Sequence, residues 1–243
     1  MQISRSIVNR NAFVLITLAF LLLTQFSIVR AEGYQLSQNL QPNQILSPNY
    51  QLSPDGKYVV YQVFTNDDSG SQGSQPFSVD AATKSRKALT PLVIGNGKFI
   101  GSFVISPNSQ TVVFNASLES DALNRSESYS IAIAAANPNL RKNIVKIPAT
   151  SQANIYEFSV SPDSLQVIFG YSLTDGSCCG NNLYAKAITG GTPPPFATKA
   201  DDQFYQSSLR FAADGRRVIY TKSVYDEFAD PTLSSIWAAN VPQ

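Results

Sequence analysis

Few residues in this 243-residue chain could carry out chemistry. The chain has no histidine, which removes the usual general base at neutral pH, the commonest zinc ligand, and the Ser-His-Asp and Cys-His arrangements. The acidic residues are scattered through turn-like segments, and no short motif pairs them for acid–base catalysis. We therefore expect no catalytic residues, no cofactor site and no metal site, and a protein that is not an enzyme.

The two cysteines, Cys178 and Cys179, are adjacent and lie between Gly176 and Gly180. In an oxidising compartment they could form a vicinal disulfide that fixes the loop. The alternatives are two free thiols, an intermolecular bridge or a soft-metal site. A metal would need further ligands, and a redox motif normally has two residues between its cysteines. We favour the disulfide or the free thiols.

Three aspartates, Asp55, Asp163 and Asp214, recur at equivalent positions and could form a ring of carboxylates around a pore. We favour a role in turns, because aspartate there forms local hydrogen bonds. Residues 66–70 offer oxygen ligands for calcium, but they lack the spacing and the terminal glutamate of a calcium loop. They are interpreted as a solvated loop tip.

These aspartates belong to a short pattern that occurs four times. The copies are Ser53-Pro54-Asp55-Gly56, Ser106-Pro107-Asn108-Ser109, Ser161-Pro162-Asp163-Ser164 and Ala212-Ala213-Asp214-Gly215. Their second positions are separated by 53, 55 and 51 residues, and each is followed seven residues later by an aromatic, namely Tyr61, Phe114, Phe169 or Tyr220. Repetition at this period with strand-type residues predicts the blades of a β-propeller.

Each copy predicts a tight turn between two strands. The first strand ends at Leu52, Ile105, Val160 or Phe211, and the second consists of consecutive apolar residues, which indicates that both of its faces are covered. Third strands are expected at residues 76–79, 129–133, 183–187 and 236–239. More polar fourth strands are expected at residues 87–90, 143–147 and 195–198, and the fourth unit lacks one. Residues 34–46 could circle back to complete the last blade.

The predicted fold is therefore all-β, a β-propeller of about four four-stranded antiparallel blades in residues 32–243. The units span approximately residues 45–97, 98–150, 151–203 and 204–243. They could form a four-bladed ring, a half-ring that pairs with a second copy, or part of a longer array. An incomplete ring would expose two apolar blade faces, and self-association is then expected.

The first 31 residues have the features of a secretory signal peptide cleaved after Ala31. Arg5 and Arg10 precede an apolar segment, and the alternative is an uncleaved membrane anchor. Export to the periplasm or the extracellular space is expected. This segment holds three of the 18 basic side chains and none of the 17 acidic ones, so the remainder has a net charge of −2. No nucleic-acid partner is expected.

Four tyrosines, Tyr34, Tyr50, Tyr156 and Tyr205, lie near the starts of the units. If exposed, they would suit a protein or sugar partner. We favour packing in the core or at the rim. Asn115 and Asn124 match the glycosylation acceptor pattern, which matters only in a host that glycosylates exported proteins.

The segments LSPDGKYVVYQ, ISPNSQTVVF and VSPDSLQVIFGYS resemble the repeats of TolB-like β-propellers, which also occur in the propeller domains of dipeptidyl-peptidase and tricorn-type peptidases. The resemblance covers most of residues 45–243 and lies in turn and core positions. It implies a propeller and, for TolB itself, a periplasmic six-bladed ring with an extra N-terminal domain that engages an outer-membrane lipoprotein. This chain departs from that pattern, because it has four units and residues 32–45 are too few for another domain.

The function expected is that of an exported, non-enzymatic scaffold that binds an envelope protein. One alternative is a propeller module associated with a separately encoded peptidase, since the chain has no nucleophile-elbow motif of its own. Another is a propeller that binds carbohydrate or cell-wall fragments through aromatic side chains.

Overall fold

The computed structural model describes residues 34–37, 39–66, 72–93, 99–118, 126–145, 153–173, 181–190, 195–197, 204–225 and 231–241. The chain divides into two compact units, Met1–Gln35 and Leu36–Gln243, and only Tyr34 and Gln35 of the first are described. The predicted signal peptide lies outside the described residues. Among those residues, no helix has the length and apolar character needed to cross a membrane.

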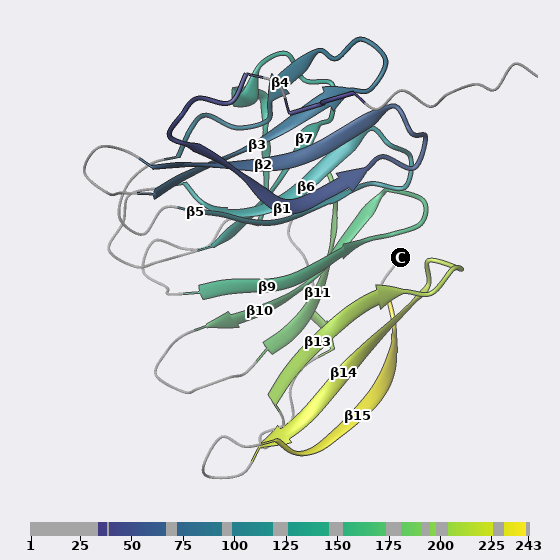
Figure 1. Ribbon diagram of the computed structural model, residues 1–243. Coiled ribbons are helices and arrows are strands. Elements are labelled where there is room, and N and C mark those ends of the chain that lie inside the picture. Colours follow the sequence, from purple (N-terminus) through teal and green to yellow (C-terminus); the bar gives the residue numbers. More distant parts are fainter. Residues whose placement is uncertain are drawn as a thin grey trace, which may run out of the picture. The chain divides into compact units, whose positions relative to one another are not determined.

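The second unit contains four antiparallel sheets, each built from strands that are consecutive in the chain (Figure 1). The first sheet contains β1 (Gln44–Leu52), β2 (Tyr58–Asn66), β3 (Gln72–Asp80) and β4 (Arg86–Ala88). The second contains β5 (Phe99–Ile105), β6 (Thr111–Ser117), β7 (Glu127–Ala132) and β8 (Lys142–Val145), with a short 3-10 turn η1 (Pro138–Leu140) before β8.

The third sheet contains β9 (Ala153–Val160), β10 (Gln166–Leu173), β11 (Asn181–Ala187) and β12 (Pro195–Ala197). The fourth contains β13 (Phe204–Phe211), β14 (Arg217–Tyr225) and β15 (Pro231–Asn240), and the described residues add no fourth strand to it. These sheets confirm the predicted all-β fold, and the four first strands end at the predicted residues Leu52, Ile105, Val160 and Phe211.

One prediction about the N-terminal segment is wrong. Residues 44–46 form the start of β1 and pair with β2, and they do not complete the fourth sheet. Leu36 and Leu40 pack against a buried cluster of the first sheet that consists of Tyr61, Val63, Phe77 and Val79. The segment covers its own sheet because it precedes β1 directly and carries leucines four residues apart, which remove apolar surface from water there.

The four repeated motifs form the predicted turns. In each, the backbone N–H of the fourth residue donates to the carbonyl of the first, at 2.8 or 2.9 Å. The fourth residue adopts a left-handed conformation in all four turns. Its φ is +72° in Gly56, +63° in Ser109, +65° in Ser164 and +67° in Gly215. Serine therefore takes the place of glycine in two turns, where its hydroxyl gains a partner in the preceding turn.

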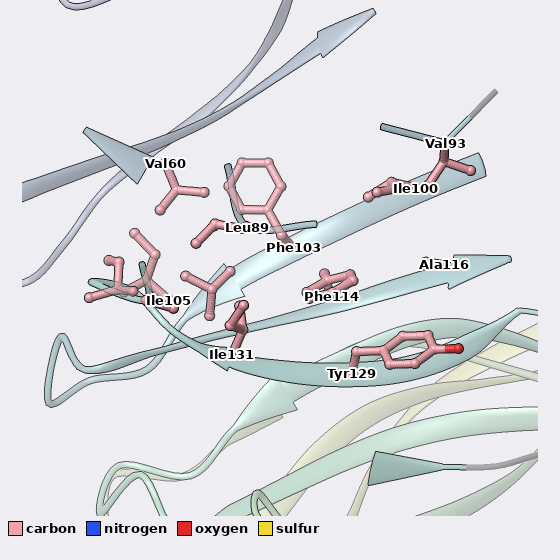
Figure 2. Packing of buried hydrophobic residues seen from close by; sticks show 13 residues of the cluster. Val60, Leu89, Val93, Ile100, Phe103, Ile105, Phe114, Ala116, Tyr129 and Ile131 are labelled. Atoms are coloured by element: carbon pink, nitrogen blue, oxygen red, sulfur yellow. The ribbon is translucent and has the colours of Figure 1, made fainter. Parts of the chain in front are cut away.

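Successive residues of each second strand pack against different neighbouring sheets. In β6, Val112 and Phe114 belong to a buried cluster with Val60 of the first sheet (Figure 2). Val113, which lies between them in the chain, packs with Ile155 of the third sheet. We call the face of a sheet that points to the earlier sheet its N-side face, and the opposite one its C-side face. The predicted covering of both strand faces is confirmed.

Side chains also donate hydrogen bonds from one sheet to the backbone of the next. The Gln62 amide donates to the Ile100 carbonyl at 2.7 Å, and the Ser78 hydroxyl donates to the Ile133 carbonyl at 2.6 Å. The Ser130 hydroxyl donates to the Ile188 carbonyl at 2.8 Å. Buried polar groups need hydrogen-bond partners. These bonds therefore fix the register between neighbouring sheets, which apolar packing alone does not.

Candidate functional site

The turn aspartates are engaged locally, as predicted. Asp55 accepts hydrogen bonds from the Ser53 hydroxyl at 2.6 Å and from the Lys57 N–H at 3.0 Å. The bond from Ser53 is the main cause that lowers the pKa of Asp55, because it stabilises the ionised carboxylate. Asp163 has the same arrangement with Ser161, and its pKa is also lowered.

Asp214 differs because alanine replaces the first serine of its turn. Its carboxylate accepts from the Arg216 N–H at 3.0 Å and forms an ion pair with Arg217 at 3.0 Å. The Arg216 N–H, followed by the Arg217 side chain, lowers the pKa of Asp214. All three carboxylates thus serve the turns.

Several other residues that the sequence singled out fall outside the part of the chain that the structure describes. Cys178 and Cys179 fall outside the described residues, as do residues 67–70 of the calcium-like segment and Asn124. Among the described residues, no group of three or more histidine, cysteine or acidic side chains is placed to hold a metal ion. The interpretation of the cysteine pair remains a prediction.

Two of the four tyrosines are exposed, so neither of them lies in the core. Tyr50 is 71% exposed, and Tyr34 is also exposed. The side chains of Tyr156 and Tyr205 are outside the described set. Asn115, in contrast, is buried and donates from its amide to the Ile155 carbonyl at 3.1 Å. A glycan on Asn115 is incompatible with this packing.

Tyr50 belongs to an exposed apolar row on the first sheet. The register of β1 places Leu46, Tyr50 and Leu52 opposite Val63, Tyr61 and Val59 of β2, which puts them on the N-side face. All three are exposed, whereas the N-side residues of the second sheet, Ile100, Phe103 and Ile105, are buried against the first sheet. We call Leu46, Tyr50 and Leu52 the β1 row.

A shallow pocket adjoins this row. It has a volume of about 230 Å³ and is lined by Asn49, Tyr50, Gln51, Ser102 and Phe103. The Gln51 side chain crosses to the second sheet there, where it donates to the Phe103 carbonyl at 2.7 Å and accepts from the Ile105 N–H at 3.1 Å. The pocket therefore lies where the first and second sheets meet, and Gln51 supplies fixed polar groups there. The Tyr50 side chain is on the opposite face of β1.

The part of the N-side face that is formed by β2 and β3 is already covered. Leu36 and Leu40 pack over the cluster around Tyr61, and the Arg86 guanidinium lies 3.6 Å from the centre of the Phe77 ring. This stacking resembles that of Arg141 in the second sheet, whose guanidinium lies 5.8 Å from the centre of the Tyr129 ring. The exposed apolar surface of the first sheet is thus concentrated on β1.

A second exposed apolar surface lies on the C-side face of the fourth sheet. Ile236 pairs with Thr221 and Ala238 pairs with Ile219, so Ile219 and Ile236 share this face. Ile236 is 80% exposed, while Leu183 at the equivalent position of the third sheet is fully buried. Ile219 is exposed, and its equivalents Val60, Val113 and Ile168 are fully buried. We call Ile219 and Ile236 the β14–β15 pair.

Solved structures with a similar fold are propeller proteins. A protein of Bacteroides ovatus described as a dipeptidyl aminopeptidase IV matches with a TM-score of 0.61 at 10% identity, over 82% of this chain and 34% of its own. The propeller domain of the Trilobed protease from Pyrococcus furiosus matches with a TM-score of 0.54 at 12% identity, over 82% of this chain and 55% of its own. Oligogalacturonate lyase from Vibrio parahaemolyticus matches with a TM-score of 0.51 at 12% identity, over 82% of this chain and 64% of its own.

The chain therefore spans between 34% and 64% of the length of these structures. No family model and no curated protein match the sequence. Together with four consecutive antiparallel sheets in the described residues, the structural matches define the fold as that of a β-propeller. They extend to propeller domains in general, so the TolB-like assignment stays a prediction.

Proposed function

We propose that this protein is a non-enzymatic β-propeller module that binds a protein partner through the β1 row. The observation that carries the proposal is the exposure of Leu46, Tyr50 and Leu52 side by side on one sheet face. Contiguous apolar side chains around an aromatic anchor, with polar groups at their margin, are typical of protein interfaces. The non-enzymatic character is inferred from a sequence without histidine.

The cellular setting belongs to the same proposal. An N-terminal segment with the pattern of a signal peptide would deliver the module to the cell envelope, where a TolB-like propeller acts as a scaffold. The repeats that resemble TolB support this part at the level of the fold, because the matching residues are turn and core positions.

A second candidate function is that of a propeller module which serves a separately encoded peptidase. It is favoured by two of the structural matches, whose names describe a dipeptidyl aminopeptidase IV and a protease propeller domain. The two candidates use the same apolar row and differ in the identity of the partner.

The test is site-specific crosslinking in the native host. A photoreactive amino acid replaces Tyr50, and a matched control places it at Leu140, which is 65% exposed and lies in η1, just before β8 of the second sheet. We expect Tyr50 to capture one protein that Leu140 does not capture. Capture of a peptidase would select the second candidate, and equal labelling from both positions would contradict a partner site on the β1 row.

A further inference from the structure

We propose that the segment before β1 is a cap, which takes the place of a neighbouring blade on the N-side face of the first sheet and closes that face against other sheets. The described residues of the cap are Leu36, Ser37 and residues 39–43. The proposal goes beyond the proposed function and does not depend on it, because Tyr50 of the β1 row stays exposed beside the cap.

The aromatic centre of the first sheet is as well buried on its N-side face as that of the later sheets. Tyr61 is 3% exposed, and its equivalents Phe114, Phe169 and Tyr220 are between 0% and 7% exposed. These three equivalents belong to apolar clusters that include residues of the preceding sheet. The cluster around Tyr61 contains buried residues of the first sheet alone, and the side chains that pack on it from outside this sheet are Leu36 and Leu40. The cap therefore lies where the later sheets have a blade.

A turn at the end of the cap reverses the chain before it enters β1. The Gln44 N–H donates to the Gln41 carbonyl at 2.9 Å, and the Gln41 N–H donates to the side-chain oxygen of Gln44 at 3.1 Å. Pro42 occupies the second position of this turn, which its fixed φ favours. The Asn43 carbonyl accepts from the Asn66 N–H at 3.0 Å, and its side-chain amide donates to the Asn66 carbonyl at 2.9 Å. These bonds fix the point at which the chain turns from the cap into the sheet.

The outer side of the cap is polar, and Arg86 extends the cover across β3. Asn39 and residues 41–43 are exposed. The Arg86 guanidinium lies 3.6 Å from the centre of the Phe77 ring and 6.0 Å from that of Tyr61, so it covers aromatic surface with a charged group. Terminal units of repeat proteins need a polar outer face for solubility. The cap and Arg86 supply such a face over β2 and β3.

The cap leaves only the first strand of this face open. Tyr50 is 71% exposed, whereas Phe103 at the equivalent position of the second sheet is 6% exposed. The second sheet buries residues of its first, second and third strands together against the first sheet, for example Phe103, Phe114 and Tyr129. A blade that packed on the first sheet in the same way would need the area that the cap occupies. The β1 row is therefore open to a narrower partner, and a further blade is excluded while the cap is in place.

The experiment compares the full chain with the double variant Leu36→Asp and Leu40→Asp. The two charges should lift the cap, because an unpaired carboxylate is costly to bury on an apolar cluster. We expect an apolar dye to fluoresce more strongly and the mass by sedimentation to rise about twofold or more, since the uncovered face should self-associate. The control variant, Leu140→Asp with Leu165→Asp, adds the same charges at leucines that are 65% and 64% exposed, and it should change neither signal.

Circular dichroism establishes whether each variant is folded. A folded double variant with the dye signal and mass of the unsubstituted chain would overturn the proposal, because the two leucines would then add stability without shielding a surface. If the aspartates prevent folding, Leu36→Ala with Leu40→Ala uncovers the same cluster by a smaller change, and the same two measurements decide.

A crosslink tests the position of the cap without unfolding the sheet. A photoreactive amino acid at Leu40 should form crosslinks within one chain to the peptides that contain Tyr61 and Phe77. Crosslinks to other segments would contradict the proposal. Capture of a protein by a photoreactive amino acid at Tyr50 is a separate measurement, so the cap and the proposed function can fail independently.

Discussion

The hydroxyl of Ser164 accepts a hydrogen bond from the backbone N–H of Asn108 at 3.0 Å and so links the turn of the third sheet to the turn of the second. Ser109 makes the same link to Asp55 of the first sheet. Both serines hold a left-handed backbone conformation that L-residues seldom adopt. The hydroxyl gives these positions a favourable contact that offsets the backbone strain, and it is missing at Gly215.

Substitutions of Gly215 should measure how much this hydrogen bond between turns contributes to the free energy of unfolding. Gly215→Ala keeps φ near +67° without a compensating contact and should destabilise the protein by about 1 kcal/mol. In Gly215→Ser the new hydroxyl can accept a hydrogen bond from the Asp163 N–H, as the Ser164 hydroxyl accepts from the Asn108 N–H, and this variant should be more stable than the alanine variant by about 0.5–1.5 kcal/mol. Urea unfolding measures the difference. Equal stability of the two variants would show that the hydroxyl forms no bond.

The turn carboxylates predict a loss of stability in acid. Hydrogen bonding lowers the pKa of Asp163 in the folded state, so its contribution is complete above the unfolded value of about 3.9 and is lost as the pH falls through the folded value. Asp163→Asn should weaken this dependence below pH 4. The variant keeps the turn, because Asn108 accepts the same two bonds in the second sheet. Thermal unfolding at pH 7 and pH 3 is the measurement, and an unchanged acid dependence would contradict it.

The burial of Phe114 against Tyr129 predicts a large loss of stability when Phe114 is truncated. Phe114 is fully buried, and its ring centre lies 5.5 Å from that of Tyr129 in a stacked arrangement. Phe114→Ala should lower the free energy of unfolding by about 3–5 kcal/mol, because it leaves a cavity between the first and second sheets. Tyr50→Ala is the matched control at an exposed ring, and a similar loss there would show that burial is not the cause.

Gly101 predicts a coupling between the second and third sheets. A Cβ there would lie 2.5 Å from the Asn115 carboxamide oxygen. Gly101→Ala should displace that side chain and break its bond to the Ile155 carbonyl, with a loss of about 1–3 kcal/mol. In an Asn115→Ala background the same change should cost much less, as a double-mutant cycle by urea unfolding would measure. Additive losses would contradict the coupling.

Local sequence was sufficient for the repeats, the turns and the strands. The Ser-Pro-Asp motif determines where Leu52 ends one strand and Tyr58 begins the next, because proline and aspartate favour that turn through contacts within a few residues. The consecutive apolar residues Val112, Val113 and Phe114 of β6 likewise indicate that both strand faces are covered, since neighbouring residues point to opposite sides of a sheet.

Burial of equivalent residues was decided only by the tertiary structure. Tyr50 and Phe103 are aromatic residues at the same position of their repeats, yet one is exposed and the other is buried. From the sequence, residues 34–46 could complete the last blade, whereas Leu36 and Leu40 of this segment cover the first sheet. Each strand follows from its own residues, whereas burial depends on a second surface that is distant in sequence.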